Sequence, residues 1–229
     1  PILPMILING CTVGIGTGWS CNVTNYNPID IIKIIKMYLN EEDISNIKIK
    51  PWYRNFKGTI EKVKGEEKKF ITKGVIKPLI KKNMYKISEL PIGMWTDNFK
   101  DKLEDLLQSK KIKDMKNYST PNTVDIDIKE CEDNMKININ NLKLTSYVYT
   151  TNMVMFDEEE KLHKFDNPIE IISSFSKIRL KYYVKRKEYL LKTLTHELNI
   201  LNSKKNFITN VINKKLKIMN INENDLCKV

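Results

Sequence analysis

Three glycines at alternate positions, Gly14, Gly16 and Gly18, are the first residues whose spacing could do chemistry. Glycine-rich strings often bind phosphate, because their backbone N–H groups meet the anion at the start of a helix. A dinucleotide fingerprint needs G-x-G-x-x-G, whereas this string reads G-x-G-x-G, and the next expected helix begins only at Pro28. A Walker-type loop needs Gly-Lys followed by Ser or Thr, and the sequence has none. The string is therefore not predicted to bind a nucleotide.

Ile15 is an apolar residue held between two of these glycines and close to Trp19. The glycines are consistent with an irregular loop, since glycine adopts backbone angles that other residues avoid. They also let a backbone approach a partner closely, and proteins that bend DNA insert apolar side chains between base steps from such positions. Residue types alone leave both interpretations open.

The thiols and imidazoles do not form a recognisable metal-binding pattern. A zinc site or a disulfide framework needs closely spaced cysteines, and no C-x-x-C spacing occurs. We expect reduced, structural thiols in an intracellular protein and no metal site. The residues concerned are Cys11, Cys21, Cys131, Cys227, His163 and His196, and both histidines are interpreted as ordinary residues.

The charge balance favours a polyanionic partner. Lysine and arginine number 39 against 28 acidic residues, which gives a formal net charge of +11 and a pI near 9.3. Nucleic acid is the first expectation and an anionic membrane surface the second. The alternative is that lysines are scattered by a composition rich in Asn, Ile and Lys. No apolar run approaches the roughly 20 residues of a membrane-spanning helix, so we expect a soluble protein with no membrane partner.

The elements that must position these residues begin with an apolar segment, residues 1–8, which resembles a strand already under way. Because the chain starts with Pro1 rather than Met, we interpret it as a piece of a longer polypeptide. A helix is expected over 27–39, with Asn27 as its N-cap and Pro28 in its first position. Its predicted buried stripe is Ile29, Ile32, Ile35, Tyr38 and Leu39, with Lys33 and Lys36 facing outward.

The middle of the chain is typical of an antiparallel sheet with flanking helices, an α+β arrangement. Short β-branched runs between Pro51 and Pro91 predict three or more strands, with turns at 64–69 and 81–83. Residues 122–130 and 142–157 also have the composition of strands. A helix is expected after Trp95, with Thr96 as its N-cap and an apolar face of Phe99, Leu103, Leu106 and Leu107.

The last third of the chain predicts one long helix. Asn167, Pro168 and Glu170 form a capping-box arrangement, and no Gly or Pro follows. Apolar residues recur at helical spacing for roughly nine turns of 3.6 residues. With so many charges on its other faces, this helix is more typical of an arm or a coiled coil than of a globular core.

Several motifs together resemble eukaryotic-type type IIA DNA topoisomerases, in the breakage-reunion core that follows the cleavage tyrosine. The motifs are PILPMILING, GIGTGWSCN, YNPIDII, WYRNFKGTIEKV, ISELPIGMWTDNFKD, NMVMFDEEEKLHKFDNPIEII and FSKIRLKYYVKRKEYLL. They are collinear over nearly the whole chain. The resemblance implies the end of a winged-helix region at 1–25, a tower domain at 26–165 and a coiled-coil arm at 166–229 that leads to the exit gate.

The resemblance also implies roles for particular residues. Ile15 matches the isoleucine that intercalates and bends the gate duplex. Thr96, after Trp95, matches a DNA-contacting threonine. The strand before the MVxFD motif matches a second DNA contact, here Leu144, Thr145, Ser146, Tyr147, Val148, Tyr149, Thr150, Thr151, Asn152 and Met153. Cys11, Thr12 and Val13 make three residues where the family usually has two, an extra residue that could tilt the loop.

For the full-length protein the resemblance implies an ATP-dependent type II topoisomerase that uses Mg2+, works as a homodimer through the exit gate and acts on double-stranded DNA in the nucleus. The catalytic arginine-tyrosine pair, the metal-binding domain and the ATPase domain would all precede Pro1, so this segment alone is expected to be inactive, with no cofactor of its own. Two alternatives remain at this point: a non-enzymatic DNA-binding architectural protein with a coiled-coil arm, and a dimerisation module with incidental basic charge.

Overall fold

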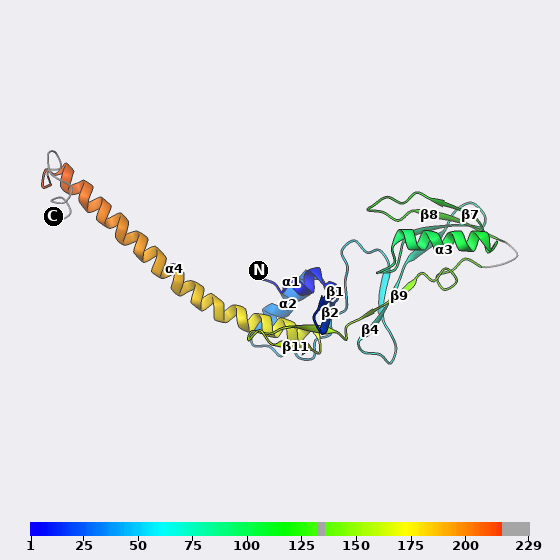
Figure 1. The fold of residues 1–229 in the computed structure, drawn as a ribbon, viewed down its shortest axis with the longest axis horizontal. Helices are drawn as coiled ribbons and strands as arrows, with labels where there is room; N and C mark the ends of the chain where they lie inside the picture. The colour runs from blue at the N-terminus through cyan, green and yellow to red at the C-terminus, as the bar shows by residue number, and fades with distance from the viewer. Residues whose placement is uncertain (132–135, 217–229) are drawn as a thin grey trace. The chain divides into compact units, whose positions relative to one another are not determined.

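The computed structural model describes residues 1–131 and 136–216, so Cys227 and the last part of the expected arm lie outside the described residues. The chain divides into two units, Pro1–Ser176 and Lys177–Val229. Figure 1 shows the elements in chain order. The prediction of an α+β protein with antiparallel sheets and a long final helix is confirmed.

The first segment is a short helix, α1 (Met5–Asn9), and the prediction of a strand there was wrong. Gly10 ends the helix with a φ of 67°, and its N–H donates to the carbonyl oxygen of Ile6 at 3.0 Å. The apolar run packs Leu7 into a core from a helix rather than from a sheet. A short, continuous apolar run does not by itself distinguish the two.

The glycine string forms a hairpin and not an irregular loop. Strand β1 (Cys11–Gly16) pairs antiparallel with β2 (Trp19–Val23). The two-residue turn between them places Gly18 at a φ of 82°, a left-handed conformation that glycine adopts without strain.

Helix α2 (Pro28–Leu39) begins as predicted, since the side-chain oxygen of Asn27 accepts a hydrogen bond from the N–H of Ile29 at 2.9 Å. The predicted buried stripe was largely wrong. Ile31 and Ile34 are buried, whereas Ile29, Ile32 and Leu39 are exposed. Isoleucines lie on several faces of this helix, so periodicity alone did not single out the face that packs.

Two antiparallel sheets lie in the middle of the chain. The first has the order β3-β4-β9, and the second has the order β5-β6-β8-β7. The predicted turns at 64–69 and 81–83 connect β3 to β4 and β5 to β6, although Lys69 already opens β4. The bounds are β3 (Thr59–Lys62), β4 (Lys69–Lys73), β5 (Val75–Pro78), β6 (Met84–Glu89), β7 (Ile112–Asn117), β8 (Ile126–Glu130) and β9 (Thr145–Tyr149).

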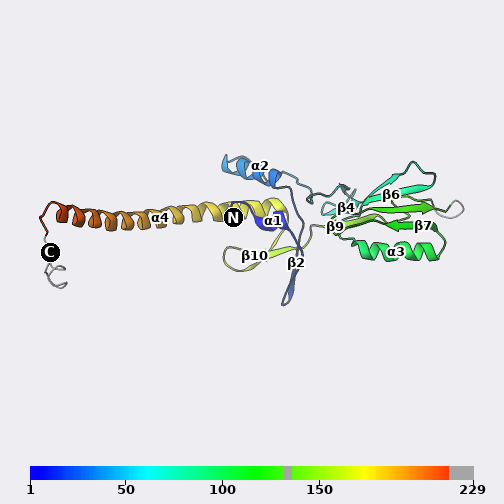
Figure 2. The same ribbon diagram turned by 90° about the horizontal axis from the view of Figure 1, so that it is seen from above.

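Helix α3 (Thr96–Gln108) lies along one face of the four-stranded sheet, as Figures 1 and 2 show. Phe99 and Leu103 are buried as predicted, but Leu107 is exposed. Thr96 is the first helical residue and not the N-cap. That position belongs to Trp95, and no side chain caps the helix there.

Two hydrophobic cores result. One is built on the four-stranded sheet and α3 and contains Ile87, Phe99, Leu103, Ile112, Ile126, Ile128 and Leu144. The other joins α1, the β1–β2 hairpin and α2 to strands β10 (Met153–Phe156) and β11 (Leu162–Phe165) and to the start of α4 (Pro168–Ile212). Residues far apart in sequence therefore hold the hairpin in place.

Helix α4 begins at the predicted N-cap, Asn167, although the Glu170 carboxylate reaches back to Asp166 and not to Asn167. The side-chain oxygen of Asn167 accepts from the N–H of Glu170 at 2.9 Å, and the Glu170 carboxylate accepts from the N–H of Asp166 at 2.8 Å. The helix has 45 residues, longer than the nine turns expected. His163 lies in β11, with Nε2 at 3.2 Å from the Glu170 carboxylate.

Candidate nucleic-acid interface

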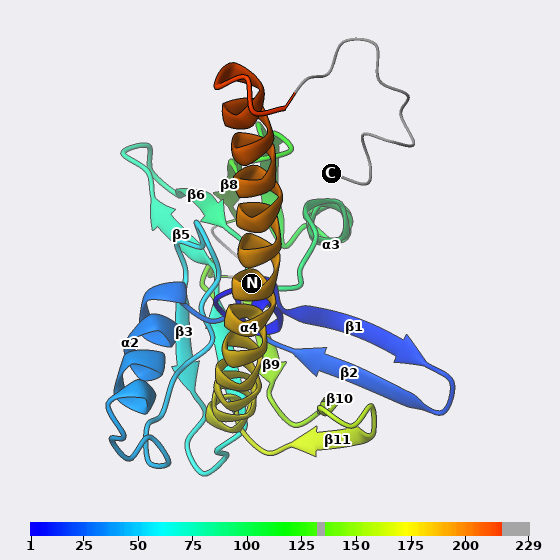
Figure 3. The ribbon, with the colours of Figure 1, turned by 90° about the vertical axis from the view of Figure 1, so that its left-hand side faces the viewer.

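Ile15 stands near the end of the β1–β2 hairpin, with 83% of its surface exposed. It pairs with Ser20, two residues from the Thr17–Gly18 turn. In Figures 2 and 3 the end of the hairpin points away from the other elements of its unit. An apolar side chain in this position contributes little to the core, so it is available to a partner.

The extra residue before Gly14 is absorbed by a bulge at the base of the hairpin. Cys11 pairs with Val23 and Gly14 with Cys21, so Thr12 and Val13 both lie opposite Asn22. A β-bulge of this kind adds one residue to one strand and bends it. Beyond the bulge the pairing is regular, and Ile15 keeps a defined face of the hairpin.

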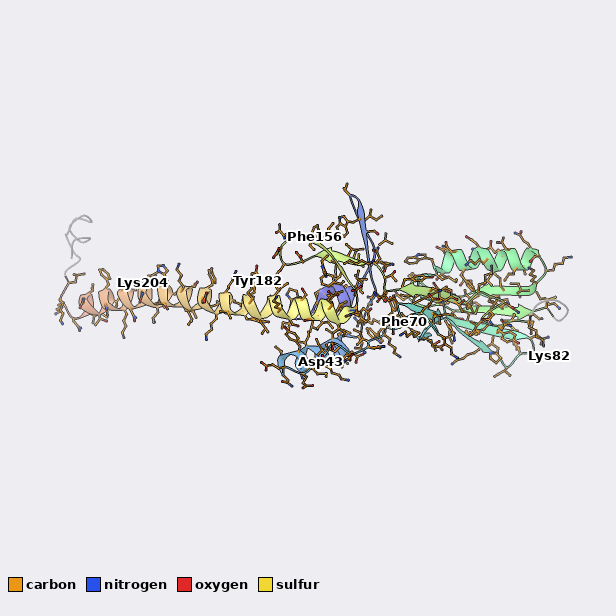
Figure 4. All side chains as sticks on the ribbon, turned by 90° about the horizontal axis from the view of Figure 1, so that it is seen from below. Asp43, Phe70, Lys82, Phe156, Tyr182 and Lys204 are labelled. Carbon is orange, nitrogen blue, oxygen red and sulfur yellow. The ribbon has the colours of Figure 1, made fainter. Side chains whose placement is uncertain are left out.

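Close packing against glycine gives the hairpin its shape. A Cβ on Gly16 would lie 2.4 Å from Nε1 of Trp19, so only glycine leaves room for the indole. The Trp19 ring in turn meets Phe156 of β10 edge to face, with ring centroids 5.6 Å apart. Figure 4 labels Phe156 beside the hairpin. Aromatic pairs in this geometry add stability beyond the area they bury, so the contact steadies the strand opposite Ile15.

The structure brings Asn152 to the same hairpin. Its side-chain amide donates to Oγ of Ser20 at 2.9 Å, and its carbonyl oxygen accepts from the N–H of Asn22 at 2.7 Å. Because Ser20 is the strand partner of Ile15, two predicted DNA contacts that are far apart in sequence lie on connected elements. Sequence reasoning missed Trp19 and Phe156, whose types alone do not reveal that they meet.

Strand β9 presents two tyrosines on the exposed face of the β3-β4-β9 sheet. Tyr147 and Tyr149 are 50% and 45% exposed. Nζ of Lys69 lies 4.7 Å from the centre of the Tyr147 ring and 5.8 Å from that of Tyr149. A hydrogen bond from the Lys69 ammonium to Glu66 raises the pKa of Lys69, which keeps the group cationic. The resulting surface combines aromatic rings with a lysine ammonium that is paired with the Glu66 carboxylate.

Other residues of the predicted 144–153 contact point inward. Leu144 and Met153 have no exposed surface and belong to the two cores. Thr150 is buried, and its hydroxyl donates to the carbonyl oxygen of Lys68 at 3.4 Å. The segment is also not one strand, because β9 ends at Tyr149 and β10 begins at Met153. The side chains of this segment that solvent reaches are those of Thr145, Ser146, Tyr147, Val148, Tyr149, Thr151 and Asn152.

Thr96 is carried by a different element from the hairpin. It is half-buried in the first turn of α3 and lines a hollow of about 600 Å³ together with Asn55, Lys57, Thr120 and the acidic Glu89. The first N–H groups of a helix carry partial positive charge, and those of α3 have no side-chain cap. The site can therefore offer a hydroxyl and backbone N–H groups to an anion.

Within residues 1–131 and 136–216, no group of three or more His, Cys, Asp or Glu side chains is placed to hold a metal ion. Over those same residues, no helix has both the length and the apolar character needed to cross a bilayer.

These features define an α+β protein in which antiparallel sheets, a glycine-shaped hairpin and a long final helix are joined in one chain. Comparison with known families gives the particular one. The family model that describes the A-subunit of DNA gyrase/topoisomerase IV matches residues 1–229, so the chain belongs to that family.

Individual relatives agree. The chain is 41% identical over 225 residues to DNA topoisomerase 2 of Invertebrate iridescent virus 6, covering 96% of this chain and 19% of that protein. It is 36% identical over 240 residues to DNA topoisomerase 2-alpha of Mus musculus, covering 100% of this chain and 15% of that protein. The chain thus spans under a fifth of the length of these relatives.

A solved structure is also similar. It is the DNA-binding, cleavage and re-ligation domain of Plasmodium falciparum topoisomerase II, with a TM-score of 0.87 and 36% sequence identity. The match covers 97% of this chain and 31% of that one.

Proposed function

We propose that this chain is the part of a type II DNA topoisomerase that binds and bends the gate duplex and links it to the dimer gate. The observation that carries the proposal is the exposed Ile15 on a hairpin whose other strand is bonded to Asn152. In the full protein the activity would be ATP-dependent passage of one duplex through a transient double-strand break in another. The names of the relatives support this reaction and do not favour a non-enzymatic architectural protein.

Ile15 would act as a wedge. Inserting an apolar side chain between base steps costs stacking energy and kinks the duplex, which then wraps more of the protein surface. A free hairpin end suits this role, because the side chain enters the stack without disturbing the core.

The polar residues near the hairpin and on β9 would hold the phosphate backbone. Ser146, Thr151 and Asn152 offer hydroxyl and amide groups, and Lys69 beside Tyr147 and Tyr149 offers a cation. Leu144, Thr150 and Met153 would anchor this segment, since their side chains are buried and the N–H groups of Leu144 and Thr150 donate to the carbonyl oxygens of Ile139 and Lys68. Such contacts position a duplex without reading its sequence. Thr96, at the positive end of α3, would bind a phosphate elsewhere on the same duplex.

Helix α4 would form the coiled-coil arm. From Lys181 to Asn210 every residue except Thr193 is exposed. An a and d heptad seam runs along it at alternating three- and four-residue intervals, with Lys205 in the one polar position. Its apolar members are Leu191, Leu194, Leu198, Leu201, Ile208 and Ile212. An apolar seam of this kind requires a partner helix to cover it, and in the full protein the arm would lead to the homodimer contact.

The family resemblance implies Mg2+ and ATP for the full-length enzyme. The described residues hold no cluster that fits a metal ion, and no step proposed for this chain involves either group. A nuclear location is part of the proposal, although one relative is named as mitochondrial and another is viral.

The test is binding of a fluorescent duplex to the chain, followed by anisotropy between about 50 and about 200 mM salt. Affinity should fall steeply as salt rises, because each phosphate contact releases counterions. A double substitution of Lys69→Gln and Asn152→Ala should weaken binding and reduce the salt slope, whereas Lys82→Gln, on the turn between β5 and β6, serves as a charge-matched control. Salt-independent affinity would overturn the proposed DNA contact and favour the dimerisation module.

A further inference from the structure

The base of the β1–β2 hairpin carries two cysteines that face the same side. Cys11 and Gly14 are three residues apart, so in a regular strand positions 11 and 14 would face opposite sides. The bulge at Thr12 and Val13 changes this. Cys11 pairs with Val23 and Gly14 with Cys21, and residues 21 and 23 share one face of β2. The bulge therefore places Cys11 on the face of Cys21.

The two side chains converge on the space that Gly14 leaves open. The thiol of Cys11 donates to the carbonyl oxygen of Cys21, with Sγ and O 3.9 Å apart. A Cβ built on Gly14 would lie 2.9 Å from Sγ of Cys11 and 3.3 Å from Cβ of Cys21. Both cysteines thus border one small volume that any residue other than glycine would fill.

The two thiols differ in access to solvent. Cys11 is half-buried, whereas Cys21 is 6% exposed and belongs to the core with Leu7 and Val23. Burial raises the pKa of Cys21, and the neighbouring Cys11 raises it further. A small oxidant arriving from solvent would therefore react with Cys11 first, and Cys21 would be the thiol that then attacks the oxidised Cys11.

We propose that Cys11 and Cys21 form a two-thiol oxidation site, at which a hydroperoxide converts the pair into a disulfide across the hairpin. The Cys11 thiolate attacks one oxygen of the peroxide, the O–O bond breaks, and a sulfenic acid forms with release of hydroxide. Sγ of Cys21, losing its proton, then attacks Sγ of Cys11, the S–O bond breaks, and a second hydroxide leaves. The two hydroxide ions take up the two thiol protons, so two thiols and hydrogen peroxide give one disulfide and two waters.

The disulfide would tie the base of the hairpin that carries Ile15. It would join β1 to β2 across the bulge, where backbone pairing is interrupted. The strands could then open less readily at this point, and amide exchange along the hairpin should slow. Reduction with a dithiol would reverse the effect. This chemistry needs no DNA, so its test is independent of the proposed DNA contact.

The test uses the full chain with Cys131→Ser and Cys227→Ser, which leaves the pair as the only thiols. One equivalent of hydrogen peroxide should remove both thiols, measured by thiol titration after denaturation, and dithiothreitol should restore them. Peptide mapping without reduction should show a Cys11–Cys21 link within one molecule. Oxidation of Cys11 to a stable sulfenic or sulfinic acid, or a disulfide between molecules, would overturn the proposal.

Gly14→Ala supplies a sharper variant, since its methyl group would lie between Sγ of Cys11 and Cβ of Cys21. The rate of disulfide formation should fall several-fold, while Thr17→Ala, an exposed change in the turn of the same hairpin, should leave it unchanged. The circular dichroism spectrum shows whether each variant is folded. If a folded Gly14→Ala variant formed the disulfide as fast as the parent chain, the proposed geometry would be wrong.

Discussion

The substitution Ile15→Ala tests whether the Ile15 side chain contacts DNA or stabilises the fold. Because 83% of the Ile15 side chain is exposed, Ile15→Ala removes almost nothing from the core, and the unfolding free energy should change by less than about 0.5 kcal/mol. If the side chain is buried between base steps, the substitution withdraws three carbons from that contact. At about 0.8 kcal/mol for each buried methylene, the loss is about 2 kcal/mol.

This energy should appear in bending rather than in overall affinity. The bent complex would be less populated by a factor of about 30, since 1.4 kcal/mol corresponds to a factor of ten. Phosphate contacts carry most of the affinity and are unaffected, so the dissociation constant should change much less. If the full-length protein cleaves the bent duplex, as the proposed function implies, its cleavage should fall together with bending.

The assay is energy transfer between dyes at the two ends of a duplex, with the complete protein in excess. Ile80→Ala is the matched control, since Ile80 is a fully exposed isoleucine on the turn between β5 and β6. The control should bend the duplex as the parent protein does. Unchanged energy transfer with Ile15→Ala, together with unchanged thermal stability, would refute the wedge.

Three further predictions concern the scaffold. Leu144→Ala should lower the unfolding free energy by about 2–5 kcal/mol in a denaturant titration, because Leu144 is fully buried, whereas Leu107→Ala on the exposed side of α3 should cost under about 1 kcal/mol. Gly16→Ala should displace the Trp19 indole and shift its fluorescence, since the added Cβ would lie 2.4 Å from Nε1; an unshifted spectrum would contradict this packing. Burial raises the pKa of Tyr26 to about 12, above its unfolded value near 10. The folded protein should therefore lose about 2–3 kcal/mol of unfolding free energy as the pH rises from ~10 towards 12. Tyr26→Phe should abolish that loss in denaturant titrations at the two pH values.

The sequence predicted those elements whose signals are local. The N-caps of α2 and α4 and the turns between strands depend on residues close to one another in sequence, and each was confirmed. Where the signal was ambiguous, prediction failed. The run at Met5–Asn9 is apolar throughout, which fits a helix as well as a strand. Strand β7 was missed because its residues, IKDMKN, alternate poorly.

The DNA contacts were predicted as a segment and not as individual side chains. The resemblance marks residues 144–153 as a continuous stretch. Only the fold shows that Leu144 and Met153 enter separate cores, while Tyr147 and Tyr149 face solvent beside Lys69. The period of two along β9 predicts alternation, yet which face is buried depends on what packs against the sheet.

The sequence by itself determined the family, the three longer helices, and the presence of Ile15 between two glycines, because these follow from residue types and short spacings. The tertiary structure decided that the glycine string is a hairpin, that its extra residue is taken up by a bulge, and that Asn152 and Phe156 hold it from the β10 side. The contacts of Asn152 and Phe156 with the hairpin join residues more than a hundred positions apart, and no local pattern specifies them. They arise when two hairpins pack on one core, where shape and hydrogen bonding select the partners.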